Sequence, residues 1–357
     1  MYLLRPSRAS DLAALLELAG FLDSPNLPAN ETFLRQRLER SERAFSELAA
    51  PHPEWEYQFS LVDGSEAVVG TCAVLSKHGS RGIPHLYLRV GQEHRHAESV
   101  DVEMRHCTLQ LEASEDGPSE IGALVLHPDA RGSAAASPER PARLLSWGRF
   151  AFVARHPTCF EQTLLAEMRA SLDTAGRNAF WEAFGRRFTG MSYAEADRKS
   201  AVDKSFILDL FPTTPFYASL LEARVASQLG KVHAEAEPAL WLLEQAGLHW
   251  VGEIDPFDAG PFFGATTSEI VPIHESTLHA VGPGEPTRDA LRRIVSAGYG
   301  AEFRAVSTPA AVELDVVCLP KDARRRLGLS DGDEVQVTPL PSRTDRSKAD
   351  AGEDRDG

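Results

Sequence analysis

Two kinds of hydrophobic pattern alternate along the chain. In some segments apolar and polar residues alternate at every position, which is the period of a strand with one buried face. The near-continuous apolar run at residues 119–127 is typical of a strand at the centre of a sheet. A Gly-Ser turn joins two of the runs into a β-hairpin. The expected strands cover residues 2–6, 57–63, 66–76, 84–91, 103–112, 119–130 and 163–169.

Other segments carry apolar residues every three or four positions, which predicts amphipathic helices. The expected helices cover residues 7–21, 31–45, 143–156, 178–188 and 238–246. Segments 178–190 and 238–252 share a weak repeat, a helix followed by Gly185 or Gly247 and a strand-like restart. This repeat is explained either by helices that pack on a sheet or by a duplicated α/β element. The order of elements predicts an α/β (α+β) fold with a mixed central sheet flanked by helices.

Composition narrows the classes of function. A net charge of −15 argues against nucleic acid and anionic membranes as partners, because phosphate binding needs a basic surface. The charge suits a cationic substrate, although acidity also serves solubility. The four cysteines form no C-x-x-C pair, which fits a reducing cytoplasm and excludes a thiolate zinc site. Acidic residues interrupt the apolar N-terminal stretch, so we expect neither a signal peptide nor a membrane span.

One segment near the C-terminus resembles the swapped-hairpin DNA-binding modules of bacterial regulators. It reads "LPKDARRRLGLSDGDEVQV", residues 319–337. Residues 302–340 carry five Lys and Arg against seven Asp and Glu, a balance that disfavours DNA. We therefore expect a small β-barrel module used for packing.

Residues 126–152 read as a strand end, a loop and a helix, an arrangement that often binds phosphate. The loop has a single glycine, Gly132, where phosphate-binding loops usually have two or three. The segment is thus a binding loop, an altered one or a surface turn.

The order of elements is that of the GNAT acyl-CoA N-acyltransferases, and the chain resembles one branch of them, the arginine N-succinyltransferases. The resemblance extends from about residue 2 to 340. The motifs that carry it include "LLRP" (3–6), "LPANETFLRQRLERS" (27–41), "LRVG" (88–91), "SEIGALVLHPDAR" (119–131), "LLSWGRFAFVA" (144–154), "LAEMRA" (165–170), "FWEAFGRRFTGMSYAEAD" (180–197), "KSFILDLFP" (204–212), "GKVHAEAEPAL" (230–240) and "IDPFDAGP" (254–261).

The resemblance implies succinyl transfer from succinyl-CoA to the α-amino group of arginine or ornithine, with no permanently bound cofactor and no metal. In that family a histidine that corresponds to His233 is the proton donor, and a leucine that corresponds to Leu124 binds succinyl-CoA. The implied organisation is a GNAT-like domain at 1–200, a second GNAT-like half at 201–282, a β-module at 283–340 and a disordered tail at 341–357.

The chemistry of such a transfer agrees with these residue types. A neutral amine attacks a thioester, so the site must deprotonate an ammonium, stabilise an oxyanion and protonate a thiolate. Backbone N–H groups of the central strand, around Leu124, Val125 and Leu126, suit the oxyanion. His233 precedes the helix 238–246 in a loop, and an imidazole suits protonation of the CoA sulfur.

The expected loop for the CoA pyrophosphate departs from the family pattern. Twelve residues, Gly132 to Arg143, stand where the family has about six. Arg131, Gly132, Arg140 and Arg143 are the candidate phosphate-binding residues. Alternatively, residues 132–139 are a flexible surface insertion.

Three acidic residues in family-matched segments are candidates for the cationic substrate: Glu31, Asp255 and Asp258. The structural alternatives are that Glu31 caps a helix and that Asp258 forms a turn. Glu167 and Arg169 are expected to alternate on a strand as a structural ion pair.

Three hypotheses of function follow. The first is an amino-acid N-succinyltransferase, and the second is an N-acyltransferase with another acyl donor or amine. The third is a non-catalytic partner subunit or ligand-binding paralogue that has lost the cofactor loop. A homo- or hetero-oligomer in the cytoplasm is expected in each case.

Overall fold

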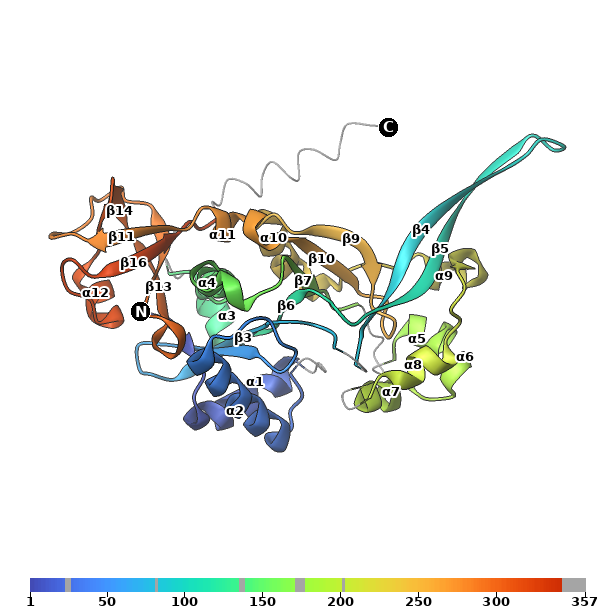
Figure 1. Ribbon diagram of the computed structural model, residues 1–357, viewed down its shortest axis with the longest axis horizontal. Helices are drawn as coiled ribbons and strands as arrows, with labels where there is room; N and C mark the ends of the chain where they lie inside the picture. Colours follow the sequence, from blue (N-terminus) through green and yellow to red (C-terminus); the bar gives the residue numbers. More distant parts are fainter. Residues whose placement is uncertain (23–26, 81–82, 135–138, 171–176, 201–202, 342–357) are drawn as a thin grey trace.

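The computed structural model describes residues 1–22, 27–80, 83–134, 139–170, 177–200 and 203–341 (Figure 1). The helices are α1 (Leu12–Leu22), α2 (Glu31–Glu47), α3 (Pro128–Ala134), α4 (Pro141–Arg155), α5 (Ala179–Ala183), α6 (Gly185–Thr189), α7 (Tyr193–Ser200), α8 (Ser205–Leu210), α9 (Ala223–Ala226), α10 (Glu237–Gln245), α11 (Val271–His274) and α12 (Lys321–Leu327). The strands are β1 (Leu3–Pro6), β2 (Glu56–Val62), β3 (Val68–Leu75), β4 (His85–Ala97), β5 (Val102–Ser114), β6 (Ser119–Leu126), β7 (Thr163–Glu167), β8 (Phe216–Tyr217), β9 (His249–Ile254), β10 (Pro261–Thr266), β11 (Thr277–Val281), β12 (Arg292–Ala297), β13 (Arg304–Pro309), β14 (Ala311–Glu313), β15 (Val316–Cys318) and β16 (Glu334–Thr338).

The strands of the described residues form one continuous sheet. Its order is β14-β15-β11-β16-β12-β13-β1-β2-β3-β6-β7-β10-β9-β4-β5-β8. The β6–β7 and β11–β15 pairs are parallel and the other pairs are antiparallel, so the sheet is mixed. The predicted mixed sheet flanked by helices is confirmed.

Helices cover both faces of the β2–β3–β6 region, because successive residues of each strand alternate between the faces. On one face, apolar residues of α1 and α2 pack with Ala73, Ala123 and Val125. On the other face, α4 packs with Cys72, Val74 and Leu126. The central strands are therefore buried on both sides, which explains their near-continuous apolar sequence.

Aromatic rings fill the core beneath α4. Phe152 of α4 lies against Phe59 of β2, with ring centroids 5.3 Å apart in an edge-to-face arrangement. Phe45 at the end of α2 contacts both rings, at 5.2 Å from each. Such pairs contribute about 0.5–1.5 kcal/mol each beyond their buried area. This aromatic cluster holds α4 against β2.

Strands β4 and β5 form a hairpin that extends away from the body of the molecule (Figure 1). The strands are longer than the sequence predicted, at 85–97 and 102–114 instead of 84–91 and 103–112. The outer residues are mainly polar and exposed, so no buried face set a hydrophobic pattern there. At its base, Leu88 and Leu109 pack with the short helices α5–α9.

The predicted helix at 178–188 is two short helices, α5 and α6, with a break at Phe184. Gly185 lies directly on the Trp181 ring, where an added Cβ would come within 2.3 Å of it. The chain continues from α6 into α7 without a strand, so the repeat predicted at 178–190 is wrong in that half. At the second half, Gly247 (φ 91°) does end α10 and leads into β9.

The C-terminal strands and α12 have a core of their own. Val295, Val317 and Leu327 pack there with Leu3 and Val62 of the N-terminal strands. Pairing of β13 with β1 joins this module to the rest of the sheet. Within residues 301–340 the strands β13, β14 and β15 precede α12, and β16 follows it. Residues 342–357 of the predicted tail lie outside the described residues.

All four cysteines are free thiols. Among the helices of the described residues, none has the length and apolar character needed to cross a membrane.

A buried ion pair ties the start of the chain to the sheet. The Arg5 guanidinium donates to both oxygens of Asp11, at 2.7 and 2.9 Å, and both side chains are buried. We expect Asp11→Ala to lower the free energy of unfolding by about 3–5 kcal/mol, because it leaves a buried cation unpaired. The exposed Glu31–Arg35 pair is the control, and Glu31→Ala should cost about 0.5 kcal/mol or less. Urea titration of both variants measures the difference, and equal losses would contradict the expectation.

Candidate active site

The two central parallel strands separate inside the sheet. Strands β6 and β7 pair only at Ser119–Leu164 and Glu120–Leu165. Beyond these pairs β6 continues beside β3, and β7 continues beside β10. Every second backbone group of β6 past Glu120 therefore faces a gap where no strand pairs with it. Buried backbone N–H groups need partners, so the gap is a place for a hydrogen-bonding ligand.

A β-bulge lies on β6 within this gap. The register with β3 shifts between Thr71–Val125 and Ala73–Gly122, so that Ala123 and Leu124 together face one residue of β3. Ala123 has φ of 50°, a left-handed conformation that costs about 1–2 kcal/mol for a residue with a Cβ. The bulge changes the direction of the main chain at Leu124. The predicted oxyanion segment, Leu124 to Leu126, thus lies on the strand that borders the gap.

The segment after β6 differs from the prediction. Pro128 to Ala134 form helix α3, so Arg131 and Gly132 belong to a helix and not to an open loop. Residues 135–138 lie outside the described residues. The Arg131 Nε donates to the carbonyl of Leu126 at 2.9 Å, which fastens this side chain to the end of β6.

Helix α4 begins immediately after this segment. Pro141 is its first residue, and Arg140 before it is left-handed (φ 49°) with no side-chain hydrogen bond that caps the helix. Pro141 has no N–H, and the Arg143 N–H donates to the Arg140 carbonyl at 2.9 Å, so the helix N-terminus offers the Ala142 N–H and a positive dipole end. The Arg143 guanidinium lies over the Trp241 ring at 5.3 Å and also donates to the carbonyl of Pro341. Of the two predicted arginines, Arg143 has a packing role within the protein.

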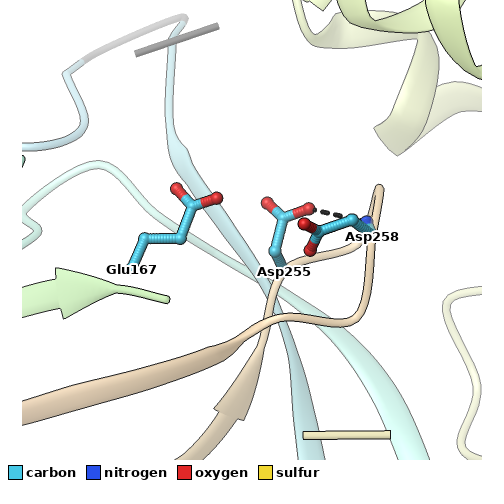
Figure 2. Close-up of side chains that lie close together, drawn as sticks. All are labelled: Glu167, Asp255 and Asp258. Carbon is cyan, nitrogen blue, oxygen red and sulfur yellow. Dashed lines mark hydrogen bonds between the residues drawn. The ribbon is translucent and has the colours of Figure 1, made fainter. Parts of the chain in front are cut away.

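Three carboxylates converge beside the gap. Glu167 ends β7, while Asp255 and Asp258 belong to the turn between β9 and β10, and Figure 2 shows the side chains directed toward one another. One oxygen from each of the three lies within 4.8 Å of the others. Strand pairing of β10 with β7 brings the turn to the end of β7.

The environment of these carboxylates disfavours ionisation. Burial, and then the charges of Asp255, Glu120 and Asp258, raise the pKa of Glu167 well above its ordinary value. Burial also raises the pKa of Asp255. For Asp258, burial and the neighbouring Asp255 raise the pKa to about 7. The group therefore shares protons near neutral pH, as closely spaced carboxylates do.

The turn that holds Asp255 and Asp258 is fixed by its own hydrogen bonds. Asp255 Oδ1 accepts the N–H groups of Phe257 at 2.7 Å and Asp258 at 3.0 Å. Asp258 Oδ1 accepts the Gly260 N–H at 2.6 Å, and Oδ2 accepts that of Ala170 at 3.1 Å. Both oxygens of Asp258 thus bind backbone, in agreement with the turn-forming alternative, whereas Oδ2 of Asp255 has no such bond.

His233 lies close in the fold to this turn. Its N–H donates to the carbonyl of Arg169 at 2.9 Å, while the nearby Gly230 N–H donates to Ala259 at 3.1 Å. The His233 Nδ1 accepts the Glu235 N–H at 3.1 Å and caps a short 3₁₀ helix, Ala234–Ala236. This bond keeps the proton of a neutral imidazole on Nε2, which leaves Nε2–H as a donor.

Two further histidines adjoin the site. His78 Nδ1 lies 2.7 Å from Glu120 Oε2. The His85 ring lies next to the His78 ring at a tilt, with centroids 4.4 Å apart, and contacts Phe262 edge-to-face at 5.3 Å. Burial lowers the pKa of His85 to about 3, so its ring is neutral. Neither ring nitrogen of His85 has a hydrogen-bond partner within the described part of the protein.

The structure separates the predicted site residues into two groups. Leu124, His233, Asp255 and Asp258 belong to strands, turns and loops that meet around β7, whereas Glu31 lies exposed on α2 and pairs with Arg35 at 2.6 Å. Sequence reasoning missed Glu120, His78 and His85, and it assigned Glu167 to a structural pair with Arg169. The strand ends at Glu167, before Arg169. For Glu167, the signal in the sequence was an acidic residue at the end of an apolar strand, which is a common position for a functional side chain.

Comparisons with known proteins agree on one family. The model of the arginine N-succinyltransferase beta subunit matches residues 2–272, and that of its C-terminal domain matches residues 277–339. The arginine N-succinyltransferase subunit beta of Pseudomonas aeruginosa is 34% identical, over 95% of this chain and 98% of its own. The arginine N-succinyltransferase of Yersinia enterocolitica is 32% identical with the same coverage of each chain.

A solved structure is also similar. It is the arginine/ornithine succinyltransferase subunit AI from Pseudomonas aeruginosa, with a TM-score of 0.81 and 27% identity over 96% of this chain and 99% of that one. The fold is that of an acyltransferase, and the protein is an acyltransferase enzyme. The chain belongs to the arginine N-succinyltransferase beta subunit family, which confirms the resemblance found in its motifs.

The carboxylate cluster predicts a pH-dependent stability. Because the folded-state pKa of Asp258, about 7, exceeds that of an unfolded aspartate, about 3.9, the folded protein binds more protons between these values. Stability from this source is complete below about pH 4 and is lost as the pH rises through 7. Asp255→Asn keeps the Oδ1 acceptor and removes the charge that raises this pKa. We expect it to increase the free energy of unfolding at pH 8 by roughly 1–2 kcal/mol.

The measurement is urea unfolding from pH 4 to 8. Asp63→Asn is the control, since Asp63 Oδ1 accepts N–H groups in a comparable turn outside the cluster. An Asp255→Asn protein whose stability falls with pH as steeply as the parent would refute the coupling.

Proposed function

We propose that the protein is an N-succinyltransferase that transfers a succinyl group from succinyl-CoA to the α-amino group of arginine or ornithine. The observation that carries this proposal is the parting of β6 and β7 beside the carboxylates of Glu167 and Asp255, in a chain of this family. The gap offers backbone N–H groups to a thioester oxygen, and the carboxylates offer a site to a cationic amine. An arginine-degrading pathway in the cytoplasm is the setting that we infer, and the four free thiols are consistent with it.

The residues present fit CoA. Helix α4 has an uncapped N-terminus next to Arg140, and anionic groups bind favourably at such a position. The helix packs on the face of the sheet that carries Cys72 and Val74, so a CoA at its N-terminus approaches the gap from that side. Leu124, Val125 and Leu126 on β6 then border the acyl group. In this arrangement Arg140 is the phosphate-binding side chain, and Arg131 and Arg143 support the backbone around it.

His233 supplies the proton that the CoA sulfur requires. Its Nδ1 accepts a backbone N–H, so Nε2–H is the available donor. Its backbone N–H donates to the carbonyl of Arg169, which lies two residues past the end of β7, and this bond holds the main chain of His233 beside that strand. An imidazole that donates to the departing thiolate avoids release of a free thiolate, which contributes typically 10²–10⁴ to a rate.

The acceptor is cationic, and the acidic turn is its binding site in this proposal. Asp255 Oδ2 is free of backbone bonds and faces Glu167, while Asp258 holds the turn in shape. Glu31 is not needed in this account, because Arg35 neutralises it on an exposed helix face. Subunit names among the relatives support an oligomer, and the projecting β4–β5 hairpin offers surface for a second subunit.

The first test is release of CoA from succinyl-CoA in the presence of arginine, ornithine, lysine or agmatine. Arginine or ornithine should accelerate release, and a protein that responds to none of the four would disprove the assignment.

His233→Ala should reduce kcat by two to four orders of magnitude, because the leaving group loses its proton donor. His274→Ala on α11 is the matched control, with an unchanged rate expected. A His233→Ala enzyme of normal rate would remove His233 from the mechanism.

The second test concerns the phosphate site. Arg140→Gln should weaken CoA binding about tenfold, since a charge-assisted hydrogen bond contributes about 1.5–3 kcal/mol. Arg155→Gln, at the opposite end of α4, should leave the affinity unchanged. Titration calorimetry with CoA measures both variants. Equal affinity for Arg140→Gln and the parent would favour a surface insertion over a binding loop.

A further inference from the structure

Glu167 stands out among the carboxylates of the site because it has no hydrogen-bond partner in the described part of the chain. Asp258 binds two backbone N–H groups, one at each oxygen, and Asp255 binds two with Oδ1. The structure gives Glu167 no hydrogen bond and no ion pair within the described residues, although the side chain is largely buried. A buried carboxylate without partners is costly, so its position calls for a ligand.

The strand register defines the face on which Glu167 lies. Leu165 pairs with Glu120 of β6, and Glu167 is two residues further along the same strand, so Glu120 and Glu167 share a face. The core beneath α4 contains Leu164 and Ala166, which point the other way. Glu167 therefore faces the side of the sheet opposite α4. A CoA bound at the N-terminus of α4 and an amine bound at Glu167 approach the gap from opposite faces.

His85 provides a second, independent sign of a ligand here. Phe262 is directly opposite Glu167 across the β10–β7 pair, so the two side chains share a face, and the His85 ring lies edge-to-face against Phe262. His85 is only 2% exposed, and both of its ring nitrogens lack partners among the described residues. A polar ligand that enters beside Glu167 would satisfy groups that the protein itself leaves unpaired.

We infer that Glu167, with Asp255, binds the α-ammonium of the acceptor amino acid and acts as the base that removes its proton. This inference rests on the proposed function. The family resemblance named only a proton donor, His233. The inference adds the base that removes the proton of the amine in the first step.

The proton and electron balance is as follows. A Glu167 oxygen takes one proton from the ammonium, and the nitrogen lone pair forms the new C–N bond at the thioester carbonyl. The C–S bond breaks and its electron pair remains on sulfur. The sulfur takes the Nε2 proton of His233 while Nε2 receives the second proton of the attacking nitrogen, so the imidazole is neutral before and after the step and no imidazolate forms. Glu167 then releases its proton to water.

The ionisable groups around Glu167 suit this role. Those that face it are Asp255 and Asp258 from the turn, Glu120 from β6 and Lys204 at the start of α8. His78 and His85 in turn face Glu120. Three acidic neighbours and burial raise the pKa of Glu167, and an efficient general base has a pKa near the working pH.

A divalent metal is the competing occupant of three carboxylates. Both oxygens of Asp258 and one oxygen of Asp255 already accept backbone N–H groups, so the set has few oxygens free for a cation that prefers six or more. An ammonium needs only the acceptors that Glu167 and Asp255 leave open. We therefore assign the site to the organic cation.

The test compares the parent enzyme with Glu167→Gln from pH 6 to 10, after urea unfolding has confirmed that the variant folds. Glu167→Gln should lower kcat by about 10²–10³ and leave the KM for succinyl-CoA unchanged. Its kcat should keep rising with pH toward the amine pKa, whereas the parent reaches a plateau at lower pH. Glu253→Gln on β9 is the matched control with the parent profile, since Glu253 pairs with Arg89 outside the cluster. A Glu167→Gln enzyme with the kcat and pH profile of the parent overturns the inference.

Calorimetry gives a second readout that does not need turnover. Arginine should bind Glu167→Gln at least tenfold more weakly than the parent, while 5-guanidinovalerate, which lacks the α-amino group, should bind both equally. An equal loss for both ligands would place the guanidinium at Glu167 and overturn the assignment. Stoichiometric binding of Mg²⁺ or Ca²⁺ that is lost in Glu167→Gln would overturn it as well. If the parent transfers no succinyl group to any amine, the proposed function fails, and the calorimetry still decides whether Glu167 binds an ammonium.

Discussion

The early separation of β6 from β7 is the constraint around which the rest of the site is arranged. Two parallel strands that pair at only two positions leave backbone groups of β6 without a strand partner on that side, at the centre of a buried sheet. The bulge at Ala123 strengthens this effect because it turns the main chain at Leu124 away from a regular ladder. Such a gap is stable only where the surrounding structure holds it open. Helix α4 and its aromatic core do so on one face, and α1 and α2 do so on the other.

The acidic turn after β9 is a second strained feature, and its position depends on the separation of β7 from β6. Burial and mutual repulsion of Glu167, Asp255 and Asp258 oppose folding near neutral pH. The close contact of Gly260 with Met168, where an added Cβ would come within 2.2 Å of the carbonyl oxygen, ties the turn to the end of β7. Under the proposed function, a cationic substrate relieves the repulsion, so that the same groups that weaken the empty protein favour the complex. Stability and binding are thus linked through one set of carboxylates.

The sequence predicted much of this arrangement and failed in identifiable places. Its motifs predicted the family, apolar runs with strand patterning predicted β2 and β3, and a near-continuous apolar run predicted β6. Strand β4 was underestimated by six residues at its outer end, because that exposed half of the hairpin has no buried face to set a pattern. The predicted phosphate loop includes helix α3, and the polar character of residues 128–134 concealed it. Glu167 was assigned to a pair with Arg169, since sequence spacing alone suggested a longer strand.

The features that the sequence predicted depend on neighbouring residues, and the features that it missed depend on contacts between distant residues. By itself the sequence determined the central strands, the helices α1, α2 and α4, the family and the flanks of His233, because periodicity and motif order are properties of neighbouring residues. Only the tertiary structure decided that Glu167 meets Asp255, which lies 88 positions further along the chain. That meeting depends on the antiparallel register of β10 with β7, and the pKa shifts depend on burial that no local pattern encodes. The carboxylates are visible in the sequence, but their shared surroundings exist only in the folded sheet.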